Sequence, residues 1–207
     1  MNKEPQFNRK IVLATKNQGK VREFTALFSK LGVEIISLKE LEKVPDVIED
    51  GNSFEENAKK KAETICLFTG IPTIADDSGL VVDELGGAPG IFSARYAGEK
   101  ATDDQNNHKL LRELTDVPIE RRSAHYVAYL AFAVPGKKTI GVEDTVEGLI
   151  LETPKGQNGF GYDPLFLIPE YEKTMAEIEP EVKNQISHRG KAMRRLFELL
   201  KNLDLLF

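Results

Sequence analysis

Two adjacent carboxylates in residues 73–80 are the groups whose type and spacing most suggest chemistry. The apolar run Thr73-Ile74-Ala75 leads to Asp76 and Asp77, which a serine and a glycine follow. We expect a strand that ends here and presents the acids at a turn. Such a turn suits Mg²⁺, which takes a few carboxylate oxygens and completes its coordination with water and substrate phosphates. The same residues are common in ordinary turns, so this segment alone leaves both interpretations open.

A polar loop near the start of the chain has the layout of a phosphate-binding site. Residues 10–15 read as a buried strand, residues 16–20 as a loop, and the helix that follows carries an apolar stripe. The unpaired amides and the dipole at a helix N-terminus favour anions, so Asn17 and Lys20 are well placed to hold phosphate oxygens. The glycine spacing is not that of a Walker loop, and a plain surface loop remains an alternative.

A second helix is predicted from Ser53, where Ser53-Phe54-Glu55-Glu56 fits a capping box, to about Phe68 before Gly70. Asn57 and Lys61 are four residues apart and share a face beside its apolar stripe. A lysine there indicates a nearby anion, unless its stem lies along the apolar surface and its amine reaches water. Just upstream, Glu49 and Asp50 offer further carboxylates.

The remaining pattern mixes strands and helices without strict alternation. A strand is predicted at 33–38, a capped helix after Thr102, a hairpin from 123–134 and 139–151, and an amphipathic helix from Lys191 to about Leu203. This pattern favours an α/β (mixed α+β) fold, in which a mixed β-sheet is flanked by helices.

Composition limits the classes of partner. The chain has 207 residues, 41% of them hydrophobic, and a formal charge of −5, which disfavours nucleic acid or an acidic membrane surface as partner. We expect a cytoplasmic protein because residues 1–9 lack the apolar core of a signal peptide and no run is long enough to span a membrane. Residues 1–9 read as a disordered or loosely attached N-terminus. The only cysteine, Cys66, reads as a core thiol.

Six motifs occur together and in order along nearly the whole chain from Lys10. They are 14–17 with Lys20, 54–58 with 61–62, 75–80, 87–90 with 93–96, 159–164, and Lys183 with 187–190. In this combination the chain resembles the inosine/xanthosine triphosphate pyrophosphatase family. The ordered set is far more specific than any one motif.

The resemblance implies an enzyme that hydrolyses the deaminated purine nucleotides ITP, dITP and XTP to monophosphate and pyrophosphate with Mg²⁺. It also implies a homodimer and a single domain over residues 10–207, whose elongated mixed sheet forms two lobes around a nucleotide cleft. One departure concerns residues 47–51, where relatives often have paired acids before Thr-Gly. We expect Glu49 to be the second metal carboxylate after Asp77.

The resemblance assigns further roles residue by residue. Asp77 corresponds to the proton acceptor and metal ligand, and we expect Lys61 and Asp76 to assist it. The expected substrate contacts are Thr15, Lys16, Asn17, Gln18, Gly19, Lys20 and Ser78 at the phosphates, and Phe160, Gly161, Tyr162, Asp163, Lys183, His188 and Arg189 at the base.

The base-side residues also make physical sense. Phe160 can stack on a purine, while Lys183 and Arg189 supply only donors, which suit O6 and N7 of a 6-oxo purine. Core aromatics at Phe160 and Tyr162, a helix cap at Ser187 and a solvated basic face are the structural alternatives. Two rival functions are a relative that acts on another triphosphate, such as a pyrimidine nucleotide, and a nucleotide-binding module without turnover.

Overall fold

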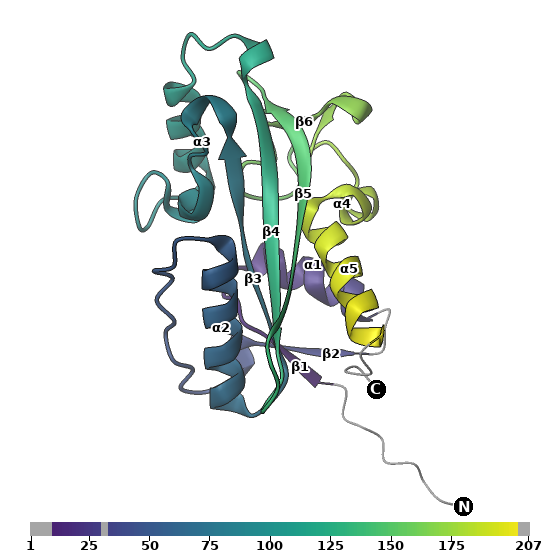
Figure 1. Cartoon of the computed structure of the whole chain (residues 1–207). Helices are drawn as coiled ribbons and strands as arrows, with labels where there is room; N and C mark the ends of the chain where they lie inside the picture. The colour runs from purple at the N-terminus through teal and green to yellow at the C-terminus, as the bar shows by residue number, and fades with distance from the viewer. Residues whose placement is uncertain (1–9, 30–32, 203–207) are drawn as a thin grey trace, which may run out of the picture.

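The computed structural model describes residues 10–29 and 33–202, which build one mixed seven-stranded sheet (Figure 1). The strand order is β2-β1-β3-β4-β5-β6-β7. The bounds are β1 Lys10–Leu13, β2 Glu34–Ser37, β3 Thr73–Val82, β4 Ser123–Ala133, β5 Ile140–Ile150, β6 Phe166–Ile168 and β7 Lys173–Thr174. β1 pairs with β2 and β3 in parallel, and every other neighbouring pair is antiparallel. The predicted α/β class and the predicted hairpin are confirmed.

Five α-helices flank this sheet in the described part of the chain. They are α1 Gln18–Phe28, α2 Phe54–Thr69, α3 Asp103–Glu113, α4 Pro180–Ile186 and α5 His188–Asn202. α2 covers one face of β3 and β4, while α1 and α5 cover the other, as Figure 1 shows. The faces follow from strand alternation: Val12 and Ala75 pack toward α2, whereas Leu13 and Ile74 pack toward α1 and α5.

The long strands carry two core regions, one at each end of the sheet. At the β1 end, apolar side chains of α1, α2 and α5 pack on both faces. At the β6 end, Leu110 and Leu114 of α3 pack with Leu80, Tyr126 and Phe166. β3, β4 and β5 run through both regions, so they hold the two lobes together.

The position of the paired acids differs from the prediction. Asp76 and Asp77 do not end a strand; they lie in the middle of β3, which pairs with β4 continuously from Thr73 to Val82. On its other edge, β3 pairs with β1 only as far as Ile74, because β1 ends at Leu13. Beyond Ile74, β3 therefore has no strand partner on the β1 side. Asp76, Asp77 and Ser78 lie along this unpaired edge, although their sequence is typical of a turn.

Helix ends follow the predicted caps with small shifts. The Ser53 and Thr102 hydroxyls each accept a hydrogen bond from the third helical amide, and Gly70 ends α2 in a left-handed conformation. The last helix begins at His188 rather than Lys191, and α4 was not predicted. Cys66 is buried, as expected. The expectations for residues 1–9 and for a helix end at Leu203 lie outside the described residues.

Candidate active site

A cavity of about 290 Å³ lies beside β3, past the end of β1, with walls from both lobes. The sequence-predicted residues that line it are Thr15, Lys16, Asn17, Lys20, Glu49, Lys61, Asp77, Ser78, Phe160, Gly161, Tyr162, Asp163, Lys183, His188 and Arg189. Gln18, Gly19 and Asp76 are not in the lining. Residues that sequence reasoning did not select, such as Arg95, Asp103 and Asn106, also line it.

The start of α1 forms one wall of this cavity. Asn17 is its N-cap, and its Oδ1 accepts hydrogen bonds from the amides of Gly19 at 2.8 Å and Lys20 at 3.2 Å. A Cβ atom at Gly19 would lie 2.5 Å from the Phe160 ring, so only glycine fits there. Gln18 is exposed and its amide reaches the Lys16 carbonyl. Asn17 and Lys20 thus line the wall, and Gly19 leaves room behind it for the Phe160 ring.

On the α2 side of β3, three charged groups meet. The ammonium of Lys61 lies 3.1 Å from Asp77 Oδ1 and 3.1 Å from Glu49 Oε1, and it donates to the Asp76 carbonyl oxygen at 2.9 Å. Lys61 is 9% exposed, so its amine does not reach out to water as the alternative reading required. Asp77 Oδ2 is buried and has no hydrogen-bond partner among the described residues. One carboxylate oxygen is therefore available to a ligand.

Burial sets the ionisation of this group. Loss of solvent raises the pKa of Asp77, and the charge of Glu49 adds to this, although Lys61 and Lys20 oppose it. Burial works against the charge of Lys61, but Asp77 and Glu49 raise its pKa. The pKa of Lys20 is lowered, mainly by burial, although Asp76 opposes the shift. Such perturbed groups in a cavity are typical of functional sites.

On the opposite face of β3, Asp76 is fully buried and fully paired. Arg189 Nε donates to its Oδ2 at 2.7 Å, the Ser78 hydroxyl donates to its Oδ1 at 2.8 Å, and the Lys20 ammonium contacts the same oxygen. Burial opposes ionisation, but Arg189 and Lys20 outweigh it and hold the pKa of Asp76 far below its ordinary value. Asp76 thereby fixes Arg189, Ser78 and Lys20, all of which line the cavity.

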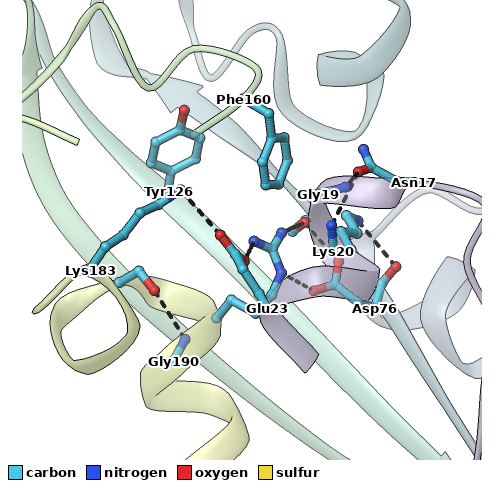
Figure 2. A network of polar contacts seen from close by, with 12 residues as sticks. Asn17, Gly19, Lys20, Glu23, Asp76, Tyr126, Phe160, Lys183 and Gly190 are labelled. Atoms are coloured by element: carbon cyan, nitrogen blue, oxygen red, sulfur yellow. Dashed lines mark hydrogen bonds and ion pairs between the residues drawn. The ribbon is translucent and has the colours of Figure 1, made fainter. Parts of the chain in front are cut away.

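Glu23 on α1 extends this network, and sequence reasoning missed it (Figure 2). Its carboxylate accepts from Arg189 Nη1 at 2.6 Å and contacts the Lys183 ammonium at 3.1 Å. Lys183 also contacts Asp163 Oδ2 at 2.6 Å. The available signal was its spacing: Glu23 follows Lys20 by three residues and therefore shares its helix face.

Phe160 forms the aromatic part of the cavity wall. The Lys183 ammonium lies 5.2 Å and the Arg189 guanidinium carbon 5.5 Å from the ring centroid, within cation–π range. Figure 2 shows the ring beside the start of α1. Tyr162 is instead a core aromatic whose hydroxyl donates to the Ser93 carbonyl at 2.8 Å. Asp163 accepts from the Phe160 amide, which closes the turn.

His188 lies at the first position of α5, after Ser187, whose hydroxyl accepts from the Gly190 amide. The His188 ring stacks on the Tyr126 ring, with the ring centroids 4.7 Å apart and the ring planes at 9° to each other. Burial, together with the charge of Arg189, lowers the pKa of His188 well below its ordinary value, so the ring is neutral at pH 7. Its buried Nδ1 has no partner within the described ranges.

Asp77 and Glu49 provide only part of the ligands that a metal ion needs. Within residues 10–29 and 33–202, no three histidine, cysteine or acidic side chains form a metal cage. Mg²⁺ does not need one, because it uses one or two carboxylates together with substrate phosphates and water. The unpartnered Asp77 Oδ2, with Glu49 on the same side of Lys61, fits that limited donor set.

Comparisons with known proteins show similar chains and similar structures. A dITP/XTP pyrophosphatase of Geobacillus kaustophilus is 58% identical over 190 residues, which cover 92% of this chain and 93% of the relative. One of Bacillus licheniformis is 52% identical over 93% of this chain and 98% of the relative. The solved Ham1 protein of Staphylococcus aureus has a TM-score of 0.83 at 42% identity, over 93% of this chain and 98% of its own.

A Ham1 protein of Coxiella burnetii gives a TM-score of 0.84 at 40% identity, with the same coverage. The model of the Ham1 family matches residues 11–199, which include both lobes and the cavity between them. The chain therefore belongs to the Ham1 family.

Proposed function

We propose that this protein hydrolyses the deaminated purine nucleotides ITP, dITP and XTP to the monophosphate and pyrophosphate, and so removes them from the nucleotide pool. The observation that carries this proposal is one cavity with two chemically different ends. The Lys20, Lys61 and Asp77 end suits a polyphosphate, and the Phe160, Lys183 and Arg189 end suits a base. Relatives at 58% and 52% identity are named dITP/XTP pyrophosphatases.

At the phosphate end, Asp77 accepts the proton of the water that attacks the α-phosphorus. A carboxylate with a raised pKa is better matched to this task than an ordinary aspartate. Lys61 and Lys20 neutralise charge on the leaving pyrophosphate, and a phosphate beside Lys20 offsets the burial that lowers its pKa. Mg²⁺, held by Asp77 and Glu49, would supply further positive charge to the triphosphate oxygens.

At the base end, selectivity follows from donors held in fixed positions. Lys183 and Arg189 are anchored by Asp163, Glu23 and Asp76, and they carry donors only. A 6-oxo purine offers acceptors at O6 and N7. Adenine would face these donors with its amino group, and an unpaired buried polar group costs roughly 1–3 kcal/mol.

We also infer that the protein is a homodimer in the cytoplasm and that residues 10–207 form one domain. The exposed side chains of Leu67 and Phe68, adjacent on α2, support a surface that another copy covers. Nucleoside triphosphates are used in the cytoplasm, which supports that compartment. Light scattering tests the dimer, with Leu67→Glu as the disruptive variant, and cell fractionation tests the location.

The activity is tested by product analysis with purified protein and Mg²⁺ against ITP, XTP, GTP, ATP, dTTP and UTP. Pyrophosphate from ITP and XTP, with GTP and ATP nearly untouched, is the expected result. Orthophosphate as the product would overturn attack at the α-phosphorus. Turnover of dTTP or UTP instead would keep the phosphate chemistry and overturn the base assignment, while tight ITP binding without product would favour a binding module.

A further inference from the structure

The loop at residues 159–163 carries Phe160 and Asp163, yet both backbone groups of one of its glycines are held by another element. The amide of Gly161 donates to Asp103 Oδ2 at 2.7 Å. The carbonyl oxygen of the same Gly161 accepts from Asn107 Nδ2 at 3.0 Å. Asp103 and Asn107 are both on α3, four residues apart, so they share one face of the helix.

This double contact lies next to the residue that faces the base. Gly161 has a φ of +63°, a conformation that glycine tolerates and that turns the chain sharply after Phe160. On the other side of Phe160, Asp163 holds the loop, because the Phe160 amide donates to Asp163 Oδ2 at 2.9 Å. A change at Gly161 therefore moves both the ring of Phe160 and the carboxylate that holds Lys183.

The ring has little freedom to adapt if this loop shifts. It lies directly against Gly19, where a Cβ atom would be 2.5 Å away, and within cation–π range of Lys183 and Arg189. The ring thus touches α1 in one lobe, while its loop is tied to α3 in the other. Correct stacking of a base requires both attachments at once.

We propose that Asp103 and Asn107 are positioning residues for base recognition, because their two hydrogen bonds to Gly161 hold the loop that places Phe160 and Asp163. The expected effect on ITP hydrolysis rests on the proposed function, whereas the expected effect on the loop at residues 159–163 does not. Asp103 also lines the cavity, so the rival explanation is a direct contact between its carboxylate and the ligand.

The structural consequence is tested first by hydrogen exchange of the unliganded protein, which requires no activity. Asp103→Ala should speed exchange in a peptide spanning 159–163 by roughly three- to tenfold, as loss of one hydrogen bond implies. Asp104→Ala is the matched control, since Asp104 also lies in the first turn of α3 but, among the described residues, forms an ion pair with His108 and no contact with Gly161. Equal exchange in both variants would overturn the proposal.

The kinetic consequence is tested with ITP in single and double variants. Asp103→Ala and Asn107→Ala should each lower kcat/KM by roughly three- to tenfold, mainly through KM, while Asp104→Ala and His108→Ala should not. Asp103→Asn keeps an acceptor oxygen and should restore most of the loss.

A Phe160→Ala background separates positioning from direct contact. If Asp103 acts through the Phe160 loop, Asp103→Ala should lower kcat/KM by a clearly smaller factor in that background than in the wild type, because the part of its effect that passes through the Phe160 ring is already lost. An undiminished loss there would overturn the proposal in favour of direct contact. If wild-type protein leaves ITP intact while Asp103→Ala still speeds exchange, the proposed function fails and the loop attachment stands.

Discussion

Asp76 and Asp77 are neighbours on β3, but they lie in opposite environments. Every oxygen of the Asp76 carboxylate is paired, with Arg189, Lys20 and Ser78, and its pKa is lowered. Asp77 has one unpartnered buried oxygen among the described residues, and burial raises its pKa. Strand alternation directs the two side chains to opposite faces of the sheet.

The difference shows how two neighbouring residues of one strand can serve different purposes, one holding other side chains in place and the other binding a ligand. A fully paired carboxylate has no capacity left for a ligand, so Asp76 is suited to hold Arg189 and Lys20 in place. An under-coordinated carboxylate is costly to bury, and such a cost is typical of a group that must bind a metal or a proton. We therefore propose that Asp76 supports the site and that Asp77 takes part in the reaction.

The largest expected effect is on turnover at Asp77. Asp77→Asn removes the proposed proton acceptor, and kcat for ITP should fall about 10³-fold, which corresponds to about 4 kcal/mol. Folding should not suffer, because the wild-type site disfavours the ionised carboxyl that the amide replaces. Initial rates at saturating ITP and Mg²⁺, with a thermal melt, measure both. Near-full turnover would break the assignment.

The same substitution one residue earlier should act on stability. Asp76→Asn leaves the buried Arg189 and Lys20 with less compensation, and the free energy of unfolding should fall by roughly 3 kcal/mol. Urea denaturation measures this, and Asp77→Asn is the matched control. Equal stability losses for the two variants would remove the contrast between the faces of β3.

A smaller effect is expected from Glu23→Gln, which loosens Lys183 and Arg189. The free energy of unfolding should fall by roughly 2 kcal/mol, and the preference for ITP over ATP should weaken. Inhibition by pyrophosphate should stay unchanged, because the phosphate end is untouched. Glu34→Gln is the control, since Glu34 forms an exposed ion pair with Lys10 and should change stability little. A change in pyrophosphate inhibition in Glu23→Gln would contradict the view that the phosphate end and the base end of the cavity act independently.

The smallest effect is the pH dependence of stability through His188. Because its pKa is lowered in the fold, the unfolded chain takes up a proton below about pH 6.5 that the folded chain does not, so stability falls as pH drops. Asp77 and Asp163, whose pKa values are raised, act in the opposite sense at lower pH. His188→Gln should remove about 1 kcal/mol of the loss between pH 7.5 and 5.5. Urea denaturation at several pH values measures this. If the free energy of unfolding changed equally with pH in the wild type and in His188→Gln, a neutral His188 would be contradicted.

Local signals predicted much of the fold. The caps at Ser53 and Thr102, the hairpin and the class of the fold depend on interactions between residues near one another in sequence. The place of Asp76 and Asp77 depends on where a distant strand, β1, stops, and nothing in residues 73–80 encodes that. α4 begins with Pro180 at its first position, a start signal that could have predicted it.

The candidate site was predicted as a set of residues but not as a network. The sequence predicted fifteen of the residues that line the cavity. It did not reveal that Glu23 joins Arg189 to Lys183, or that Asp103 holds Gly161. The Glu23–Arg189 and Asp103–Gly161 contacts, for example, join residues 166 and 58 positions apart. Such pairings follow from the packing of whole elements, which no local pattern records.

The early end of β1 also bears on solubility. An open strand edge offers unpaired backbone groups to any passing strand and so invites aggregation. At the middle of this edge, the carbonyl oxygen of Asp76 accepts hydrogen bonds from both Lys61 and Lys20. The two ammonium groups therefore protect the sheet from edge-to-edge association in the absence of a nucleotide.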